Sequence, residues 1–293
     1  MDRPSNPTRF LLLLLVSACN RPGPVVAEAA APAVDVGKSS LHHECVGEGS
    51  PVVVFDAGLG DDGSVWSRVQ PEVGRFTKAC TYDRAGRGRS TGPRARSNRE
   101  MARQLHGMLV ASVPGPYVLV AHSMGGVNVR LLESEHPREV AAMVLVDAVS
   151  DEQPERYWSL VPPDAMLEFR RGMPRMGELD FEALVSGIHD MRVSSRSLGD
   201  KPLVVLTRGT EPPAPWASPA LSARMLGTWH EMQAELVDLS TNGVFVVART
   251  SGHYIQRDAP QLVVAAVRAA VQAARTRTRI DARELTRLAG AGP

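Results

Sequence analysis

The sequence predicts an α/β fold in which a mostly parallel sheet is flanked by helices on both faces. Its apolar residues gather in short runs that end at Gly, Pro or Asp and do not alternate with polar residues. Such continuous runs are typical of strands buried on both faces. Helical stretches such as 125–135 and 262–274 lie between them, and this alternation of strand and helix favours a parallel sheet. The clearest runs are Val52–Phe55, Ala79–Tyr82, Tyr117–Val120, Met143–Val146, Leu203–Leu206 and Val244–Val247.

The composition is that of a globular protein. The chain has 293 residues, of which 43% are hydrophobic and 22% charged, and its 33 basic and 32 acidic side chains leave a formal net charge of +1. This balance disfavours nucleic-acid binding by bulk electrostatics. No apolar run reaches the roughly 18 residues that a membrane-spanning helix needs. A multi-span membrane protein and a wholly disordered chain are therefore excluded.

The N-terminus is typical of an export signal. Arg3 and Arg9 precede the apolar run 10–16, which is too short to cross a bilayer. A basic segment followed by a short apolar one is the pattern of a secretory signal peptide. We expect residues 1–18 to be that signal.

Cys19 directly follows Val16-Ser17-Ala18, and together the four residues resemble the lipobox of bacterial lipoproteins. The resemblance implies that Cys19 receives a lipid and becomes the mature N-terminus, and Asn20, which is not Asp, points to the outer membrane. An ordinary signal peptide with a chance cysteine is the alternative, and would give a secreted protein. The Ala- and Pro-rich residues 19–37 are expected to form a tether without strand or helix.

The strongest functional signal is Ser123, which lies between the run that ends at Val120 and a predicted helix. A serine at a sharp strand-to-helix turn is exposed at the edge of the sheet, and its neighbours two residues away must be small. Ala121 and Gly125 satisfy this condition. The N-terminus of the following helix also favours a developing negative charge nearby.

From about Leu41 to Ala274 the chain resembles the α/β-hydrolase family. Four further motifs match in order, and the family implies an eight-stranded sheet with a helical lid. By the match, the backbone N–H groups of Leu59 and Met124 would form the oxyanion hole, although Ala57 replaces the usual His of that loop. The matching segments are Phe55 to Gly60, Tyr82 to Ser90, Met143 to Asp147 and Ser251 to Tyr254.

The resemblance assigns His253, on the turn after the last strand, as the general base. The acid that completes a triad is open between two carboxylates. Asp147 directly follows one strand, and Glu211 lies in the loop after the next, where most relatives carry the acid. His122 precedes the serine and is expected to point away from the reaction.

The resemblance also divides the chain into domains. Residues 38–148 and 202–274 are the two parts of the core, 149–201 are the helical lid, and 275–293 form a C-terminal tail that is expected to fray. The Met and aromatic residues of the lid suit an apolar acyl or aromatic substrate. Packing of the lid on the core explains them equally well.

Cys45 and Cys80 fall on strands that are neighbours in the sheet of this family. A disulfide is therefore geometrically allowed, and an exported protein would meet oxidising conditions. Two free buried thiols remain the alternative. No His, Cys or carboxylate cluster has the sequence spacing of a zinc site, so we expect neither a metal nor a cofactor.

These observations predict a serine hydrolase that cleaves a carboxylic ester, or an amide, of a small to medium apolar molecule through an acyl-enzyme. A serine-based aminopeptidase, carbon–carbon bond hydrolase or perhydrolase of the same fold is the first alternative. A non-catalytic envelope-binding protein on this fold is the second. The expected partners are the small-molecule substrate and a membrane reached through the Cys19 anchor. The oligomeric state is left open.

Overall fold

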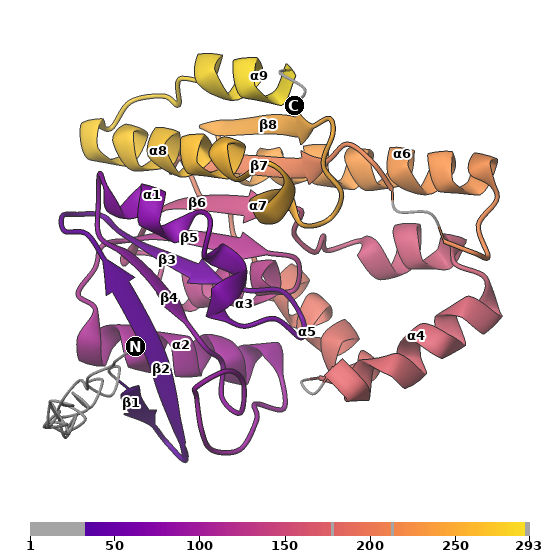
Figure 1. Cartoon of the computed structure of the whole chain (residues 1–293), viewed down its shortest axis with the longest axis horizontal. Helices are drawn as coiled ribbons and strands as arrows, with labels where there is room; N and C mark the ends of the chain where they lie inside the picture. The colour runs from indigo at the N-terminus through magenta and orange to yellow at the C-terminus, as the bar shows by residue number, and fades with distance from the viewer. Residues whose placement is uncertain (1–32, 177–178, 212–213, 291–293) are drawn as a thin grey trace, which may run out of the picture. The chain divides into compact units, whose positions relative to one another are not determined.

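This computed structural model describes residues 33–176, 179–211 and 214–290. They form an eight-stranded sheet flanked by helices (Figure 1). Its strands are β1 (Ala33–Val36), β2 (Ser39–Val46), β3 (Val52–Asp56), β4 (Ala79–Tyr82), β5 (Tyr117–His122), β6 (Val140–Val146), β7 (Leu203–Arg208) and β8 (Gly243–Ala248). The α-helices are α1 (Gln70–Gly74), α2 (Asn98–Ser112), α3 (Gly125–Glu135), α4 (Pro163–Met176), α5 (Phe181–Ser194), α6 (Pro219–Glu235), α7 (Ile255–Asp258), α8 (Pro260–Thr276) and α9 (Arg283–Gly290).

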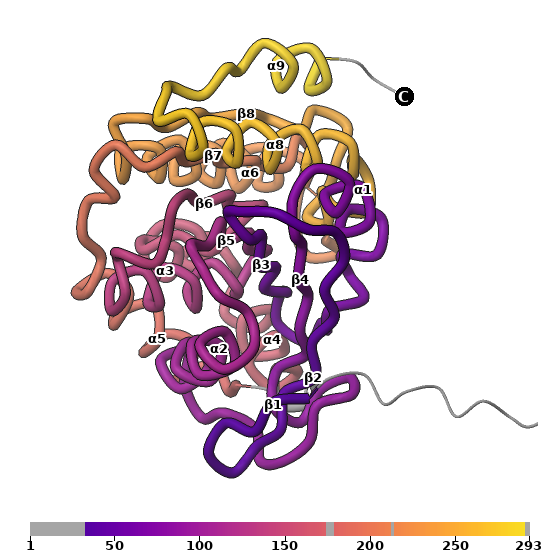
Figure 2. The backbone as a smooth tube through the Cα atoms, turned by 90° about the vertical axis from the view of Figure 1, so that its left-hand side faces the viewer, coloured from indigo at the N-terminus to yellow at the C-terminus, as the bar shows by residue number. Residues whose placement is uncertain are grey.

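The strands are ordered β1-β2-β4-β3-β5-β6-β7-β8. The pairs β1–β2 and β2–β4 are antiparallel, and all the other neighbours are parallel. In the second view, α2, α3 and α5 lie on one side of the sheet and α1 and α8 on the other (Figure 2). The mostly parallel, helix-flanked sheet confirms the predicted fold class.

Two apolar cores explain why the strands are continuously hydrophobic. Alternate residues of β5 belong to different cores: Leu119 packs with the side of α2 and α3, whereas Val118 and Val120 pack with the side of α1 and α8. All three side chains are fully buried. A strand that contributes to a core on each face cannot carry polar residues on alternate positions.

Cys45 and Cys80 are directly opposite each other in the antiparallel β2–β4 pair. Their Cα atoms are 4.1 Å apart, and a disulfide joins them. Of the two alternatives that the sequence left open, the structure therefore has the bridged one.

Replacing both cysteines with serine should lower the free energy of unfolding by about 4 kcal/mol, because the bridge closes a loop of sequence separation 35 and so restricts the unfolded chain. Chemical denaturation of the double variant Cys45→Ser/Cys80→Ser measures the loss. Thiol titration of the unfolded, unreduced wild type is the control and should find neither cysteine free. Titration of both would contradict the bridge.

The two ends of the described chain are more ordered than the sequence suggested. Residues 33–36, predicted to belong to the tether, form edge strand β1 against β2. In the tail predicted to fray, α9 buries Leu285 completely in the core beside α8. Both elements are short and half exposed, so their hydrophobic pattern is weak. They form because β1 pairs with β2 and because Leu285 of α9 packs into the core.

The export and lipidation predictions for residues 1–18 and Cys19 lie outside the described residues and stay predictions. Within the described part, no helix is both long enough and apolar enough to cross a membrane.

The segment predicted as a lid lies between β6 and β7 and contains α4, α5 and two short helical turns, Gln153–Tyr157 and Trp158–Leu160. We call residues 147–202 the helical insertion. Helix α4 projects beyond the carboxyl ends of β6 and β7, where the sequence places the reactive residues (Figure 1). This is the edge of the sheet at which ligands bind in open α/β folds.

Candidate active site

Ser123 occupies the turn between β5 and α3 with a positive φ of 53°, a left-handed conformation that non-glycine residues rarely adopt. The turn is held by hydrogen bonds from Ser123 N to the Val146 carbonyl (3.2 Å) and from Gly126 N to the Ser123 carbonyl (3.0 Å). A Cβ on Gly125 would lie 2.7 Å from the carbonyl oxygen of Ala57. Glycine is required there because the turn brings two backbones into contact.

Two backbone N–H groups beside Ser123 are available to a ligand. Leu59 and Met124 line a cavity of about 350 Å³ together with Ser123 and His253. Within the described residues, neither of their N–H groups donates a hydrogen bond. Two free donors beside a serine are the arrangement that stabilises an oxyanion.

Arg84 holds the loop that carries Leu59. Its guanidinium donates to the carbonyl oxygens of Ala57 (2.8 Å) and Gly58 (2.5 Å) and forms a buried ion pair with Asp56 (2.8 Å). With those carbonyls bound to Arg84, the loop keeps a fixed conformation. Sequence reasoning did not find this role, because the arginine comes from a different loop.

Asp147, not Glu211, is the carboxylate beside His253. The Nδ1 atom of His253 lies 2.6 Å from Asp147 Oδ2. Glu211 instead accepts hydrogen bonds from Arg208 (2.6 Å) and from the Tyr157 hydroxyl (2.7 Å). Asp147 also has a positive φ, 46°, in the turn after β6. Of the two carboxylates that the sequence left open, Asp147 is therefore the one that contacts His253.

The Asp147 carboxylate is fully buried and saturated with donors. Oδ1 accepts from the backbone N of Arg208 (2.9 Å), from Trp229 Nε1 (2.7 Å) and from the Thr207 hydroxyl (3.3 Å). Oδ2 accepts from Arg208 Nη1 at 2.9 Å. Burial alone would raise the pKa of Asp147, but the Arg208 charge and the His253 hydrogen bond outweigh it and hold the pKa well below its usual value. Asp147 is thus an anion at neutral pH.

Arg208 is the residue that connects the two carboxylates. It lies at the end of β7, is only 4% exposed, pairs with both Asp147 and Glu211, and stacks 4.1 Å from the Trp229 ring centre. Its guanidinium also donates to the Tyr157 hydroxyl at 2.9 Å. Sequence reasoning missed this cluster. The available signal was an arginine at a strand end where relatives usually place an acid.

His122 does not line the cavity at Ser123, in line with the prediction that it points away from the reaction, and its ring packs against that of His253. The two imidazole centres are 4.5 Å apart, and His122 Nε2 lies 2.9 Å from the carbonyl oxygen of His253. Burial, together with the neighbouring His253, lowers the pKa of His122 well below its usual value. His122 is therefore neutral, donates through Nε2 and supports the His253 backbone. Gly58 makes room for it, since a Cβ there would lie 2.8 Å from His122 Nδ1.

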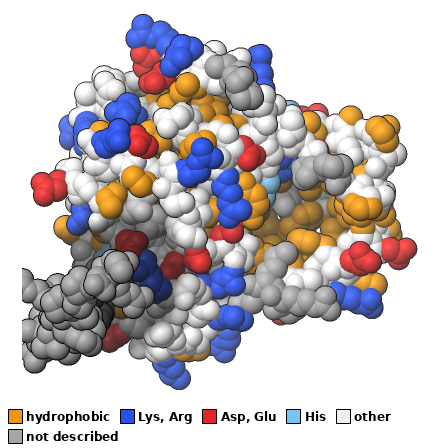
Figure 3. Space-filling model, in the orientation of Figure 1, with side chains coloured by type: hydrophobic (Ala, Val, Ile, Leu, Met, Phe, Trp, Pro, Cys, Tyr) orange, Lys and Arg blue, Asp and Glu red, His pale blue; other side chains and the backbone are white. Residues whose placement is uncertain are grey.

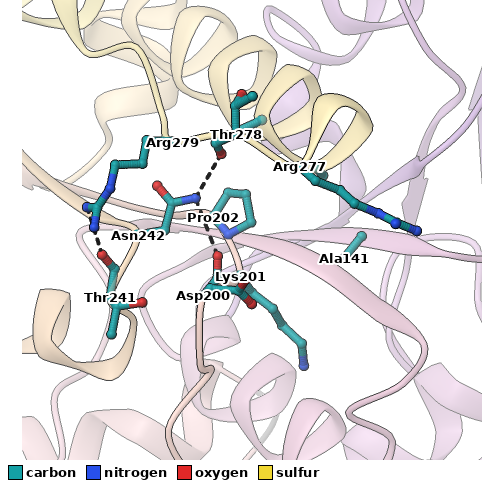
Figure 4. A pocket seen from close by; sticks show the side chains of 11 residues that line it. Ala141, Asp200, Lys201, Pro202, Thr241, Asn242, Arg277, Thr278 and Arg279 are labelled. Atoms are coloured by element: carbon teal, nitrogen blue, oxygen red, sulfur yellow. Dashed lines mark hydrogen bonds between the residues drawn. The ribbon is translucent and has the colours of Figure 1, made fainter.

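A second cavity, of about 470 Å³, lies at the opposite, amino-terminal ends of β6 to β8 (Figure 4). Its polar groups bind the chain itself: Asn242 Nδ2 donates to the Thr278 carbonyl (3.1 Å), Ile280 N donates to Asn242 Oδ1 (3.0 Å), and Arg279 donates to the Thr241 carbonyl (3.1 Å). These bonds attach the segment that leads to α9. The cavity offers no nucleophile next to a base.

Comparison of the sequence with models of known families shows which family the chain belongs to. The sequence model described as "Alpha/beta hydrolase family" matches residues 53–267. The chain belongs to this family. The match begins inside β3 and covers β4 to β8, the serine turn and the turn with His253, so the site described above lies within the matched part of the chain.

Individual proteins match this chain at low sequence identity. YqjL, an uncharacterized protein of Bacillus subtilis (strain 168), is 26% identical over 223 residues, which are 75% of this chain and 83% of the relative. An AB hydrolase superfamily protein of Gibberella zeae is 22% identical over 77% of this chain and 87% of its own length. Among solved structures, a thermophilic esterase from Thermogutta terrifontis superposes with a TM-score of 0.58 at 19% identity, covering 83% of this chain and 99% of the esterase. At that identity the superposition shows a common fold.

Proposed function

We propose that this α/β hydrolase is a serine hydrolase that cleaves a carboxylic ester, or an amide, through an acyl-enzyme intermediate. The observation that carries the proposal is the 2.6 Å contact between His253 Nδ1 and the buried Asp147 carboxylate, at a cavity that also contains Ser123. A carboxylate at Nδ1 fixes the proton there and leaves Nε2 free to accept one.

In the proposed reaction, Ser123 Oγ attacks the substrate carbonyl carbon while His253 Nε2 takes its proton. The negative charge on the carbonyl oxygen is stabilised by the N–H groups of Leu59 and Met124. Protonated His253, stabilised by Asp147, then gives the proton to the leaving group, and the acyl group stays on Ser123. Water, deprotonated by His253, hydrolyses this ester and restores the serine.

The shape of the site supports an apolar substrate. A neighbouring cavity of about 530 Å³ shares four lining residues with the cavity at Ser123, namely Tyr157, Trp158, Phe169 and Glu211. We call this neighbouring cavity the apolar chamber. It is also lined by Ala165, Met166, Trp216 and Met225. Figure 3 shows a hollow lined by hydrophobic side chains on the side where α4 and α6 lie. The helical insertion supplies part of this wall, so it both packs on the core and lines the substrate space.

If the chamber holds an apolar chain of the substrate, kcat/KM for p-nitrophenyl esters should rise with acyl length, by up to about fourfold per methylene, because each buried methylene contributes about 0.8 kcal/mol. Ala165→Trp should fill the chamber, abolish this rise and leave acetate turnover unchanged. Ala220→Trp, at an exposed position of α6, is the matched control. A flat chain-length profile in the wild type would exclude the chamber as the substrate space.

The test of the reaction itself is covalent labelling with a fluorophosphonate probe, located by peptide mass spectrometry. Labelling of Ser123 that is lost in Ser123→Ala but kept in Ser134→Ala, a serine on the outer part of α3, is the expected result. Absence of label from folded protein, with a smaller sulfonyl fluoride as well, would refute the proposal. The envelope-binding alternative would then take its place.

We also propose that the enzyme acts in the cell envelope. The support is the lipobox-like sequence that ends at Cys19. Incorporation of labelled palmitate into the wild type, but not into Cys19→Ser, would be the expected outcome. Equal incorporation would leave no role for Cys19.

A further inference from the structure

We propose that the chain carries a second site, distant from Ser123, that binds a divalent cation of the zinc class through His106, His136 and Glu139. The three residues come from different places in the fold. His106 is on α2, His136 ends α3, and Glu139 directly precedes β6. Their ligand atoms all lie within 4.8 Å of one another, which no other group of three His, Cys or carboxylate residues achieves in the described part of the chain.

The distances suit one metal ion. The same carboxylate oxygen, Glu139 Oε1, lies 3.3 Å from His106 Nε2 and 3.6 Å from His136 Nδ1. In a tetrahedral zinc site with bonds of about 2.0–2.2 Å, neighbouring ligand atoms are about 3.3–3.6 Å apart. Two imidazoles and one carboxylate are also a donor set that zinc uses, with a water in the fourth position. The side chains of all three residues are partly exposed (21–38%), so water has access.

The backbone fixes the part of the site that follows α3. His136 N donates to the Leu132 carbonyl (2.8 Å), Glu139 N donates to the His136 carbonyl (3.1 Å), and Tyr117 N donates to the Glu139 carbonyl (2.8 Å). His136 and Glu139 are therefore held on one tight turn that is attached to β5. A site with two ligands already fixed loses less conformational entropy on binding.

The two imidazoles stack face to face, with centres 3.5 Å apart and planes inclined by 10°. Because the lone pair of an imidazole lies in the plane of its ring, at least one ring must rotate out of the stack to share a metal. The His106 side chain is partly exposed, so its ring can rotate toward solvent. The Glu139 carboxylate lies beside both rings and would supply the negative charge that a cation needs.

The place of the site indicates a structural role. Glu139 precedes β6 at the amino-terminal edge of the sheet, whereas Ser123 follows β5 at the carboxyl-terminal edge. A bound ion would link α2 to the α3–β6 turn without contact with substrate. Sequence spacing could not reveal the site, because the last turns of α2, the whole of β5 and the whole of α3 separate His106 from His136.

Zinc binding by the purified full chain, without a polyhistidine tag and after chelator treatment, tests the proposal. Competition against a chromogenic chelator should give one Zn²⁺ per chain, and Zn²⁺ should raise the midpoint of thermal unfolding. Both His106→Ala and the near-isosteric Glu139→Gln should weaken binding at least about tenfold. His189→Ala, an exposed histidine on α5, should bind like the wild type.

Equal zinc affinity in the wild type, His106→Ala and Glu139→Gln would overturn the proposal, as would no binding by the wild type. Fluorophosphonate labelling of Ser123 should be the same with and without Zn²⁺. The metal site and the proposed hydrolase activity can therefore fail independently.

Discussion

Replacing Asp147 with asparagine should lower kcat for an ester substrate by about 10⁴-fold. Three donors surround Asp147 Oδ1, namely Arg208 N, Trp229 Nε1 and the Thr207 hydroxyl. In the variant these three donors favour the amide oxygen of the new side chain at the position of Oδ1. Its NH₂ group then takes the position of Oδ2 and points toward His253 Nδ1. The imidazole then keeps its proton on Nε2 and cannot accept one from Ser123.

Glu211→Gln is the matched control, because it removes a carboxylate of the same cluster that does not contact His253. Its kcat should stay within about tenfold of the wild type, since Arg208 can still donate to the amide oxygen at the Oε2 position and the Tyr157 hydroxyl can accept from the amide NH₂ at the Oε1 position. Steady-state kinetics of both variants, with circular dichroism to verify folding, make the comparison. If Asp147→Asn kept near wild-type turnover while Glu211→Gln lost it, the assignment of the acid would be wrong.

The strands and the order of the motifs could be predicted from sequence because their signals are local. A strand buried on both faces is apolar at every position, as β5 is up to Ala121, and the serine turn needs small residues on either side of Ser123. Either property is visible without knowing what packs against it. For Cys45 and Cys80 the assumed sheet order showed only that a disulfide is geometrically possible, and the choice between a bridge and two free thiols needed the structure.

The acid could not be predicted, because Asp147 and Glu211 follow adjacent strands and both are within reach of the same space. What decides between them is Arg208, whose guanidinium engages Glu211 with two donors and directs it to Tyr157. That choice depends on side-chain packing among β6, β7 and α6, which no local pattern encodes. The contact of His122 with the His253 backbone and the meeting of His106 with His136 could not be predicted for the same reason.

Replacing Arg208 with methionine should destabilise the fold by about 3–5 kcal/mol and lower kcat at least about 100-fold. The change leaves Asp147 buried without its cation and also removes the partner of Glu211. Asp147 then takes up a proton more readily, and a protonated Asp147 no longer stabilises the imidazolium of His253. An effect on both stability and turnover is expected because one guanidinium serves both.

The pH dependence of stability tests whether Arg208→Met loses stability through the unpaired charge of Asp147. In the wild type the pKa of Asp147 is below its unfolded value of about 3.9, so its contribution to stability is complete above that pH and is lost as the pH falls through the folded pKa. In Arg208→Met the folded pKa of Asp147 rises above the unfolded value, and ionisation then opposes folding. The stability difference between the two proteins should therefore increase from about pH 3 toward about pH 7.

Arg208→Lys keeps the charge but cannot reach two carboxylates with a planar fork, so it should recover part of both losses. Denaturant unfolding between about pH 3 and 7 and kcat at neutral pH measure the series. A stability difference that does not change with pH would mean that Arg208 acts through its packing on Trp229 rather than through the charge of Asp147. Wild-type kcat in Arg208→Met would mean that Asp147 holds His253 without help from the cation.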